Sequence, residues 1–271
     1  MFLRVPLIQI CVAFPLIAHG IGSAAAVDFL REVQPILVRG TIASSGKRRA
    51  DLTAHLGWAD FLLWKEKGGD LHPEDKYRQA LALDSTNAYA HTMWGHWILF
   101  RRGSMDEARA HFAAAIHSGT NRDVVRGLQI SALTNLDDST GDAEMLRVAS
   151  EMQKRAEPAT VELRRRMARM ICLDPSSGVR SANSSGHPLR AVVSPHEDLA
   201  AVQWLFADVS LTDDQSVGRD FCIAASQEAA GQREQALAMF KSVRVRLPKF
   251  SNLQPGVDAA IRRLSSPSSA R

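Results

Sequence analysis

Four histidines lie close together in the segment 91–117, and imidazole groups at this density can bind a metal ion, hold haem or transfer protons. They are His91, His96, His111 and His117. Ligands that share one helix face are three or four residues apart, whereas His91 and His96 are five apart, about 140° around a helix. A site between two helices, for example from His96 and His111, would need a further carboxylate or cysteine that the pattern does not place. We therefore predict no metal site and expect each ring to be satisfied locally.

The other motifs that could carry chemistry are incomplete. Covalent haem attachment requires C-x-x-C-H, but the cysteines stand far apart at positions 11, 172 and 222. A phosphate loop has four residues between its glycines and a hydroxyl residue after its lysine, whereas Gly40 and Gly46 enclose five and Arg48 follows the lysine. The segment HEDLA at 196–200 lacks the second histidine of a zinc-protease helix, and no G-x-S-x-G sequence is present. We therefore predict no catalytic residues and no cofactor, and expect that the chain is not an enzyme.

The composition is that of a protein with a packed core. The chain has 271 residues, of which 45% are hydrophobic and 6% aromatic, so wholesale disorder is not expected. The net charge of +4 and the pI near 9.2 reflect a small basic excess that is spread along the chain. Such an excess is weak evidence for nucleic-acid binding, and we expect no nucleic-acid partner.

The N-terminus has the layout of a secretory signal peptide. Arg4 provides the basic region, an apolar run over 5–18 follows, and Ala24-Ala25-Ala26 offers a cleavage site before Val27. The run is shorter than the roughly 20 residues that span a bilayer, although an uncleaved anchor helix is the alternative. We expect residues 1–26 to be removed and the chain to be exported, to the periplasm or secreted, with the bacterial periplasm favoured. No transmembrane segment would remain after cleavage.

Cleavage would leave two cysteines, Cys172 and Cys222. Two cysteines of an exported protein can form a disulfide. Both residues lie in apolar helical patterns, where two separately buried thiols are equally typical. The positions of the two cysteines in the sequence do not decide between a disulfide and two separate thiols.

Residues 51–264 have the pattern of successive short helices. Apolar residues recur at a spacing of three and four, and breaks that combine Gly or Pro with capping residues separate the helices. The preceding segment 27–50 is expected to be a partly irregular lead-in. Within the helical region, residues 175–195 are rich in Ser, Gly and Pro and predict an irregular loop, while the tail 265–271 is expected to be disordered.

A spacing of 35 residues relates two of these helices, since it separates both Tyr77 from Phe112 and Ala80 from Ala115. Residues at i, i+4 and i+7 share one helix face. Small residues on that face let a partner helix approach, and the aromatic ring fills the remaining gap. Residues 236–243 carry a similar stripe nearer the C-terminus.

This pattern resembles the tetratricopeptide repeat (TPR), a helix–turn–helix unit with a period of about 34 residues. That family has a Leu-Gly pair in its first helix, A-x3-F in its second and a closing proline. The corresponding packing positions here are Tyr77, Ala80, Gly95, Ala108, Phe112, Ala115, Ala236, Phe240 and Pro248. The sequence departs from the family pattern at several places: Trp94 replaces the leucine, Ser85 and Thr120 replace the proline in two copies, and Pro73 stands where a small residue is expected.

The resemblance covers residues 54–121 and 217–250. The middle region has suitable helices without the signature, predicted at 122–136, 141–156, 159–173 and 196–210. The resemblance implies an all-α fold in which residues 51–264 form a right-handed α-solenoid of TPR-like repeats. A non-repetitive helical bundle is the alternative.

The resemblance further implies a scaffold that binds a protein or peptide partner in a concave groove lined by the first helix of each repeat. In the helix predicted around 88–100, one face would carry the groove residues Tyr89, Thr92, His96, Leu99 and Phe100. Two other functions stay open. One is a structural spacer of the cell envelope. The other is an enzyme or enzyme subunit with a site near the loop 175–198, where His187 and His196 would meet Glu197 or Asp198.

Overall fold

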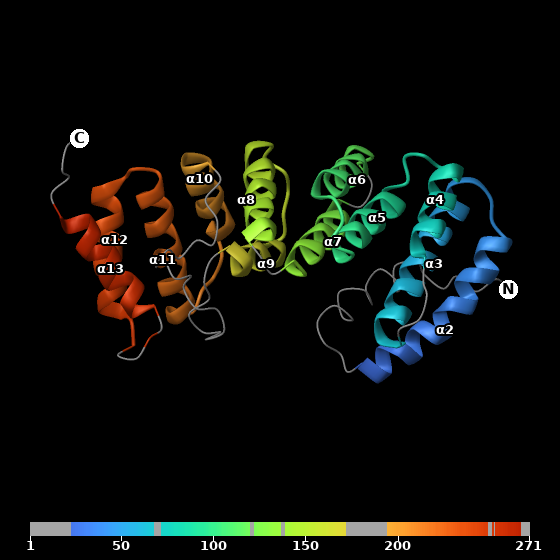
Figure 1. Ribbon diagram of the computed structural model, residues 1–271, viewed down its shortest axis with the longest axis horizontal. Coiled ribbons are helices and arrows are strands. Elements are labelled where there is room, and N and C mark those ends of the chain that lie inside the picture. Colours follow the sequence, from blue (N-terminus) through green and yellow to red (C-terminus); the bar gives the residue numbers. More distant parts are fainter. Residues whose placement is uncertain are drawn as a thin grey trace. The chain divides into compact units, whose positions relative to one another are not determined.

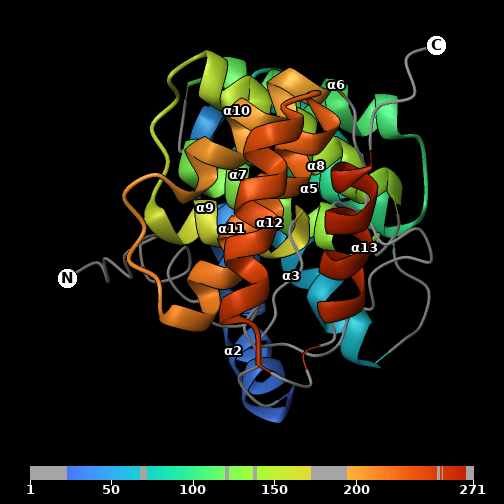
Figure 2. The same ribbon diagram turned by 90° about the vertical axis from the view of Figure 1, so that its left-hand side faces the viewer.

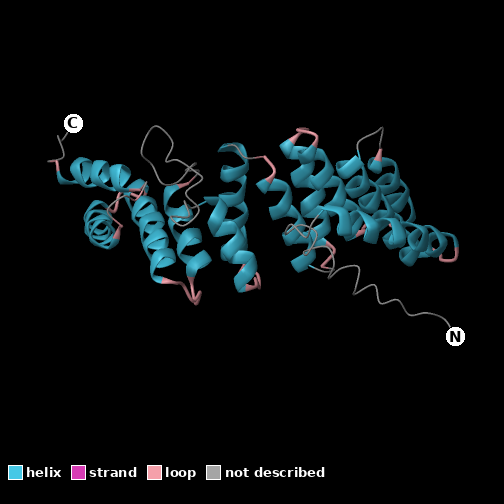
Figure 3. Cartoon of the chain, turned by 90° about the horizontal axis from the view of Figure 1, so that it is seen from below, coloured by secondary structure: helices cyan, strands magenta, loops and turns pink. Residues whose placement is uncertain are grey.

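The computed structural model describes residues 23–67, 72–119, 122–136, 139–171, 194–248, 251 and 253–266. These residues form twelve helices and no strand (Figure 3). The predicted all-α class is therefore confirmed. Most residues of the predicted signal peptide, of the predicted loop and of the predicted tail lie outside the described residues. The end of the predicted loop is described, and there Pro195 begins a helix. The lead-in segment 27–50 falls on the first described helix and the beginning of the second.

The chain divides into two compact units, Met1–Asn135 and Leu136–Arg271, which we describe separately. The helices of the first unit are α2 (Ser23–Ile42), α3 (Gly46–Lys67), α4 (Pro73–Leu83), α5 (Ala88–Phe100), α6 (Met105–His117) and α7 (Arg122–Thr134). Each of α2 to α6 packs against the next helix in the chain (Figure 1). In addition, α3 contacts α5 and α5 contacts α7. This pattern is consistent with stacked helical hairpins.

Side-chain caps fix the hairpin formed by α5 and α6. The side chain of Asn87 accepts a hydrogen bond from the Ala90 N–H at 2.9 Å, and the hydroxyl of Ser104 accepts one from the Glu107 N–H at 3.3 Å. Both caps satisfy backbone donors that have no partner within the first turn of a helix. The sequence therefore sets where each helix of this hairpin begins.

In two hairpins of the first unit, α3–α4 and α5–α6, a glycine of one helix lies in close contact with an aromatic ring of the other helix. A Cβ atom on Gly95 would lie 3.1 Å from Cζ of Phe112, and one on Gly57 would lie 2.9 Å from Cε1 of Tyr77. Gly57 is not among the packing positions that we predicted. It precedes Tyr77 by 20 residues, whereas Gly95 precedes Phe112 by 17, mainly because α3 continues farther beyond its glycine than α5 does. The pair Leu56-Gly57 is the signal that could have identified it.

The helices of the second unit are α8 (Ser139–Lys154), α9 (Val161–Ile171), α10 (Pro195–Phe206), α11 (Asp213–Ala229), α12 (Arg233–Arg246) and α13 (Gln254–Ser265). Contacts join α8 to α9 and α10, α9 to α10, and each helix from α10 onward to the next. Figure 2 shows α11, α12 and α13 together. The four helices that we predicted in the middle region correspond to α7, α8, α9 and α10.

The α11–α12 hairpin repeats the packing of the first unit. Ala236 and Phe240 are fully buried, and the ring of Phe240 lies 6.0 Å from that of Phe221 in an edge-to-face arrangement. Pro248 follows α12 and is exposed. The remaining predicted packing positions, Tyr77, Ala80, Gly95, Ala108, Phe112 and Ala115, are all buried.

Cys222 in α11 is buried and disulfide-bonded. The chain's other cysteines, Cys11 and Cys172, lie outside the described residues. Within the described part of the chain, no helix combines the length and the apolar character that crossing a bilayer requires.

Candidate binding site

The five residues that we predicted to line a groove lie on α5, which packs against other helices of the first unit. The side chains of Thr92, His96 and Leu99 are buried, while Tyr89 and Phe100 are half-buried. The reason is that α5 contacts α3, α4, α6 and α7, so that neighbours surround it. The rings of Tyr89 and Phe100 pack on aromatic residues of α3. The side chains of α5 that we predicted to line a groove thus pack against other helices of the first unit.

His96 is held among aromatic rings. Its ring centroid lies 4.8 Å from that of Trp58, in an edge-on arrangement, and 5.7 Å from that of Phe61. Its Nδ1 is buried and has no hydrogen-bond partner among the residues that the structure describes. Burial, with a smaller effect from the charge of Lys65, lowers the pKa of His96 to about 3. The ring is therefore neutral near pH 7 and serves the packing of α3 against α5.

The structure brings together a different pair of histidines from the one that we considered. The Nδ1 atoms of His91 on α5 and His111 on α6 lie 2.9 Å apart. Burial, followed by the charge of His91, lowers the pKa of His111 to about 4. His117 is exposed. No group of three or more His, Cys, Asp or Glu side chains in the described ranges is arranged to hold a metal ion.

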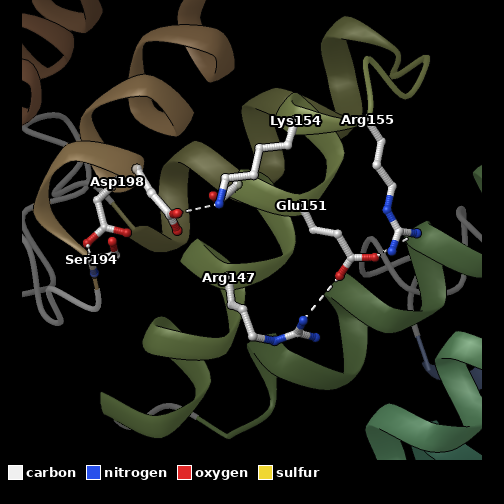
Figure 4. A pocket seen from close by; sticks show the side chains of 8 residues that line it. Arg147, Glu151, Lys154, Arg155, Ser194 and Asp198 are labelled. Atoms are coloured by element: carbon white, nitrogen blue, oxygen red, sulfur yellow. Dashed lines mark hydrogen bonds and ion pairs between the residues drawn. The ribbon is translucent and has the colours of Figure 1, made fainter.

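An open cleft of about 360 Å³ lies between α8 and α10 in the second unit (Figure 4). Charged side chains dominate its walls, with three basic and three acidic groups and two serines. The lining residues are Arg147, Ser150, Glu151, Lys154, Arg155, Ser194, Glu197 and Asp198. Both walls belong to the same compact unit.

The α8 wall is an ion-pair ladder at helical spacing. Arg147 donates two hydrogen bonds to the carboxylate of Glu144, at 3.0 and 2.7 Å, and a third to Glu151 at 3.1 Å. Glu151 also accepts from Arg155 at 3.1 Å and so lies between two guanidinium groups, as Figure 4 shows. The hydrogen bond to Glu144, with smaller effects from both carboxylates, raises the pKa of Arg147. These pairs hold long side chains in defined positions on the cleft wall.

The α10 wall begins at the helix N-terminus. The Ser194 N–H donates to the buried carboxylate of Asp198 at 3.1 Å, and Pro195 occupies the first turn, where its lack of an N–H costs nothing. Glu197 reaches across the cleft to Lys154 at 2.5 Å. On the opposite wall, the Ser150 hydroxyl is buried without a hydrogen-bond partner in the described part of the chain.

The cleft lies in the region without a repeat signature. Glu197 and Asp198 were named from the sequence only for the alternative function as an enzyme. His196, named with them, is exposed and does not line the cleft, and His187 lies outside the described residues. A usable signal exists in α8, where Glu144, Arg147, Glu151 and Arg155 follow one another at intervals of three and four and so share a face.

Comparison with known proteins gives no relative for this chain: no protein-family model, no curated protein and no solved structure matches it.

Proposed function

We propose that this chain is an exported scaffold of TPR-like helical repeats, arranged as a right-handed solenoid, that binds a protein or peptide partner without catalysing a reaction. Its helical hairpins and their buried small and aromatic residues support the repeat assignment. The disulfide at Cys222 supports export, because disulfides persist in oxidising compartments such as the periplasm.

We place partner binding in the cleft between α8 and α10. The single observation that carries this assignment is an open cleft of about 360 Å³ whose charged walls are already ordered by ion pairs. A side chain that its own protein holds in position loses little further freedom when a partner binds. The residues of α5, in contrast, are enclosed by other helices.

The charges of the cleft indicate the chemistry of the partner. The side chains of Arg155 and Lys154 are 62% and 52% exposed, so each can bind a carboxylate while it keeps its present ion pair. Glu197 is 49% exposed and can accept from a cationic group. The expected partner is therefore an extended peptide segment with acidic and basic side chains near each other.

Site-specific photo-crosslinking tests this assignment. The photoreactive residue p-benzoylphenylalanine would replace Ser194, which lines the cleft without a charge, in the full chain expressed in its host, with replacement of the exposed Val245 on α12 as the control. We expect a defined protein adduct from position 194 that is absent from position 245. The spacer alternative predicts no adduct specific to position 194.

A charge swap separates partner binding from stability. Lys154→Glu alone and Glu197→Lys alone each place like charges across the cleft, whereas the double variant restores an attractive pair with its order reversed. With the photoreactive group again at Ser194, we expect the double variant to keep wild-type stability and to lose the adduct. Retention of the adduct in the double variant would contradict recognition by charge.

Export is tested by the N-terminus of the mature protein. We expect N-terminal sequencing of the chain purified from its host to begin at Val27. A mature chain that begins at Met1 would support the uncleaved anchor instead.

A further inference from the structure

His91 and His111 bring two ring nitrogens together at the junction of α5 and α6. Their Nδ1 atoms are 2.9 Å apart, and their ring centroids are 5.2 Å apart at an angle of 48°. Both side chains are half-buried, so the pair is accessible from solvent. The two helices that carry the rings form a capped hairpin, which fixes the pair on rigid elements.

The hydrogen bond at the far side of His91 determines which of its nitrogens carries the proton. Its Nε2 lies 3.1 Å from the carbonyl oxygen of Ser85. A carbonyl only accepts hydrogen bonds, so Nε2 of His91 is the donor, and in the neutral ring the lone pair is on Nδ1. That lone pair points at Nδ1 of His111, which donates its proton to it. Metal-binding histidines are held in the same way, with the second ring nitrogen donating to a carbonyl or carboxylate.

The two nitrogens are close enough to act as neighbouring ligands of one ion. With metal–nitrogen bonds of about 2.0 Å, two ligands at 90° lie about 2.8 Å apart, and two at the tetrahedral angle lie about 3.3 Å apart. The 2.9 Å between them is the length of the present N–H···N hydrogen bond, so binding at a right angle requires only a rotation of the rings that turns both lone pairs toward the ion. Square-planar coordination by nitrogen and oxygen is characteristic of Cu(II) and Ni(II). Of these two ions, Cu(II) generally binds more tightly to a given set of ligands.

We propose that His91 and His111 form a two-histidine binding site for Cu(II), in which water fills the remaining coordination positions. Both Nδ1 atoms are the ligands. The proton of His111 moves from Nδ1 to its Nε2 when the ion binds, so the site takes up the ion with no net release of a proton from neutral rings. This proposal is independent of the proposed partner cleft, which lies in the other unit.

The surroundings of the pair supply a spectroscopic reporter. The ring of Trp94 lies 4.7 Å from that of His111 at an angle of 30°. The guanidinium of Arg78 lies 5.9 Å from the centroid of the Trp94 ring. Asp75 forms an ion pair with Arg78 at 2.7 Å, which offsets the positive charge of the guanidinium. Because Cu(II) is paramagnetic, its binding at this position quenches the fluorescence of Trp94.

Copper titration of the untagged chain tests the proposal. CuCl2 would be added in a buffer that does not coordinate copper, with isothermal calorimetry and tryptophan fluorescence as readouts. We expect one Cu(II) per chain, with the affinity reduced at least about tenfold by His91→Gln or by His111→Gln. The matched control is His117→Gln, on the same α6 helix and exposed, which should bind as the wild type does. The Trp94→Phe variant should keep the affinity and lose most of the quenching.

Two further measurements use the wild-type protein, so their results do not depend on whether a variant folds. Electron paramagnetic resonance of the wild-type complex should show a tetragonal Cu(II) signal with hyperfine coupling to two imidazole nitrogens. Zn(II), which prefers the wider tetrahedral angle, should bind more weakly than Cu(II). Coupling to fewer than two imidazoles, or the same copper affinity in the His91→Gln/His111→Gln double variant, would overturn the proposal.

Discussion

The interface between α3 and α5 buries ionisable side chains as neutral groups. The interface between α8 and α10, in contrast, leaves charged side chains partly exposed. In the first, His55 and His96 are buried as neutral rings, and burial is the main cause of the lowered pKa of each. In the second, Arg147, Glu151 and Lys154 remain charged, partly exposed and paired. A closed interface excludes charge because desolvation costs more than pairing returns, whereas an open one keeps charges at the edge of water. The closed interface is suited to stability, and the partner binding that we propose falls on the open one.

Removal of a buried phenylalanine ring should have the largest effect on the free energy of unfolding. It should also test whether the two units share one packing mechanism. Phe112 and Phe240 occupy equivalent places in the α5–α6 and α11–α12 hairpins, and both are buried. We expect Phe112→Ala and Phe240→Ala each to lower the free energy of unfolding by about 3–5 kcal/mol, measured by chemical denaturation. Val245→Ala, at a side chain that is 86% exposed, is the control and should stay within about 0.5 kcal/mol. A loss below 1 kcal/mol for either phenylalanine would contradict a common packing mechanism.

Acid should act on the closed interface through His96. Its folded pKa of about 3 lies below its ordinary value of 6.5, so the unfolded chain binds an additional proton between these values. Stability is therefore fully present above pH 6.5 and is lost as the pH falls toward 3, by at most about 1.4 kcal/mol per pH unit from this ring. We expect His96→Leu to make the loss of stability between pH 6 and pH 4 less steep in denaturation curves. His117→Gln, at an exposed position, should leave the wild-type dependence unchanged, and an unaltered slope in His96→Leu would refute the assignment.

The helices and their hairpin packing could be predicted because both depend on contacts at short and regular separations. The intervals of four and three residues between Ala108, Phe112 and Ala115 already place these side chains on one face of their helix. Whether a face is open is a different question. The residues Tyr89, Thr92 and His96 suit a groove by type, but four other helices surround α5, and their number depends on the tertiary arrangement.

The candidate sites were missed because each is formed between helices. His91 and His111 lie on the two helices of one hairpin, and the sequence does not give the register between those helices, so the pair considered between them was His96 and His111. The cleft joins α8 to α10 across a long segment, so its two walls have no fixed spacing in the sequence. The charge ladder on α8 was visible at intervals of three and four, but its partner wall was not.

The open interface should be sensitive to the loss of one member of its inner ion pair. The side chain of Glu144 is only 2% exposed and receives both hydrogen bonds of the Arg147 fork. We expect Arg147→Met to cost about 1–3 kcal/mol, because the buried carboxylate loses two hydrogen bonds from a charged group. Glu144→Leu combined with Arg147→Met should recover most of that loss, since no buried charge remains. Equal destabilisation of the single and double variants would show that the pair is not the cause.

The smallest expected effect on stability belongs to the pair that bridges the cleft. Lys154 and Glu197 are both about half exposed, so water competes with their interaction, and Lys154→Ala should lower the free energy of unfolding by less than about 1 kcal/mol. The same variant should weaken crosslinking to the partner several-fold, because Lys154 is one of the two basic groups open to a partner carboxylate. Val245→Ala again provides the matched exposed control. A large loss of stability with unchanged crosslinking would reassign this ion pair from recognition to folding, and the two interfaces would then differ only in their exposure to water.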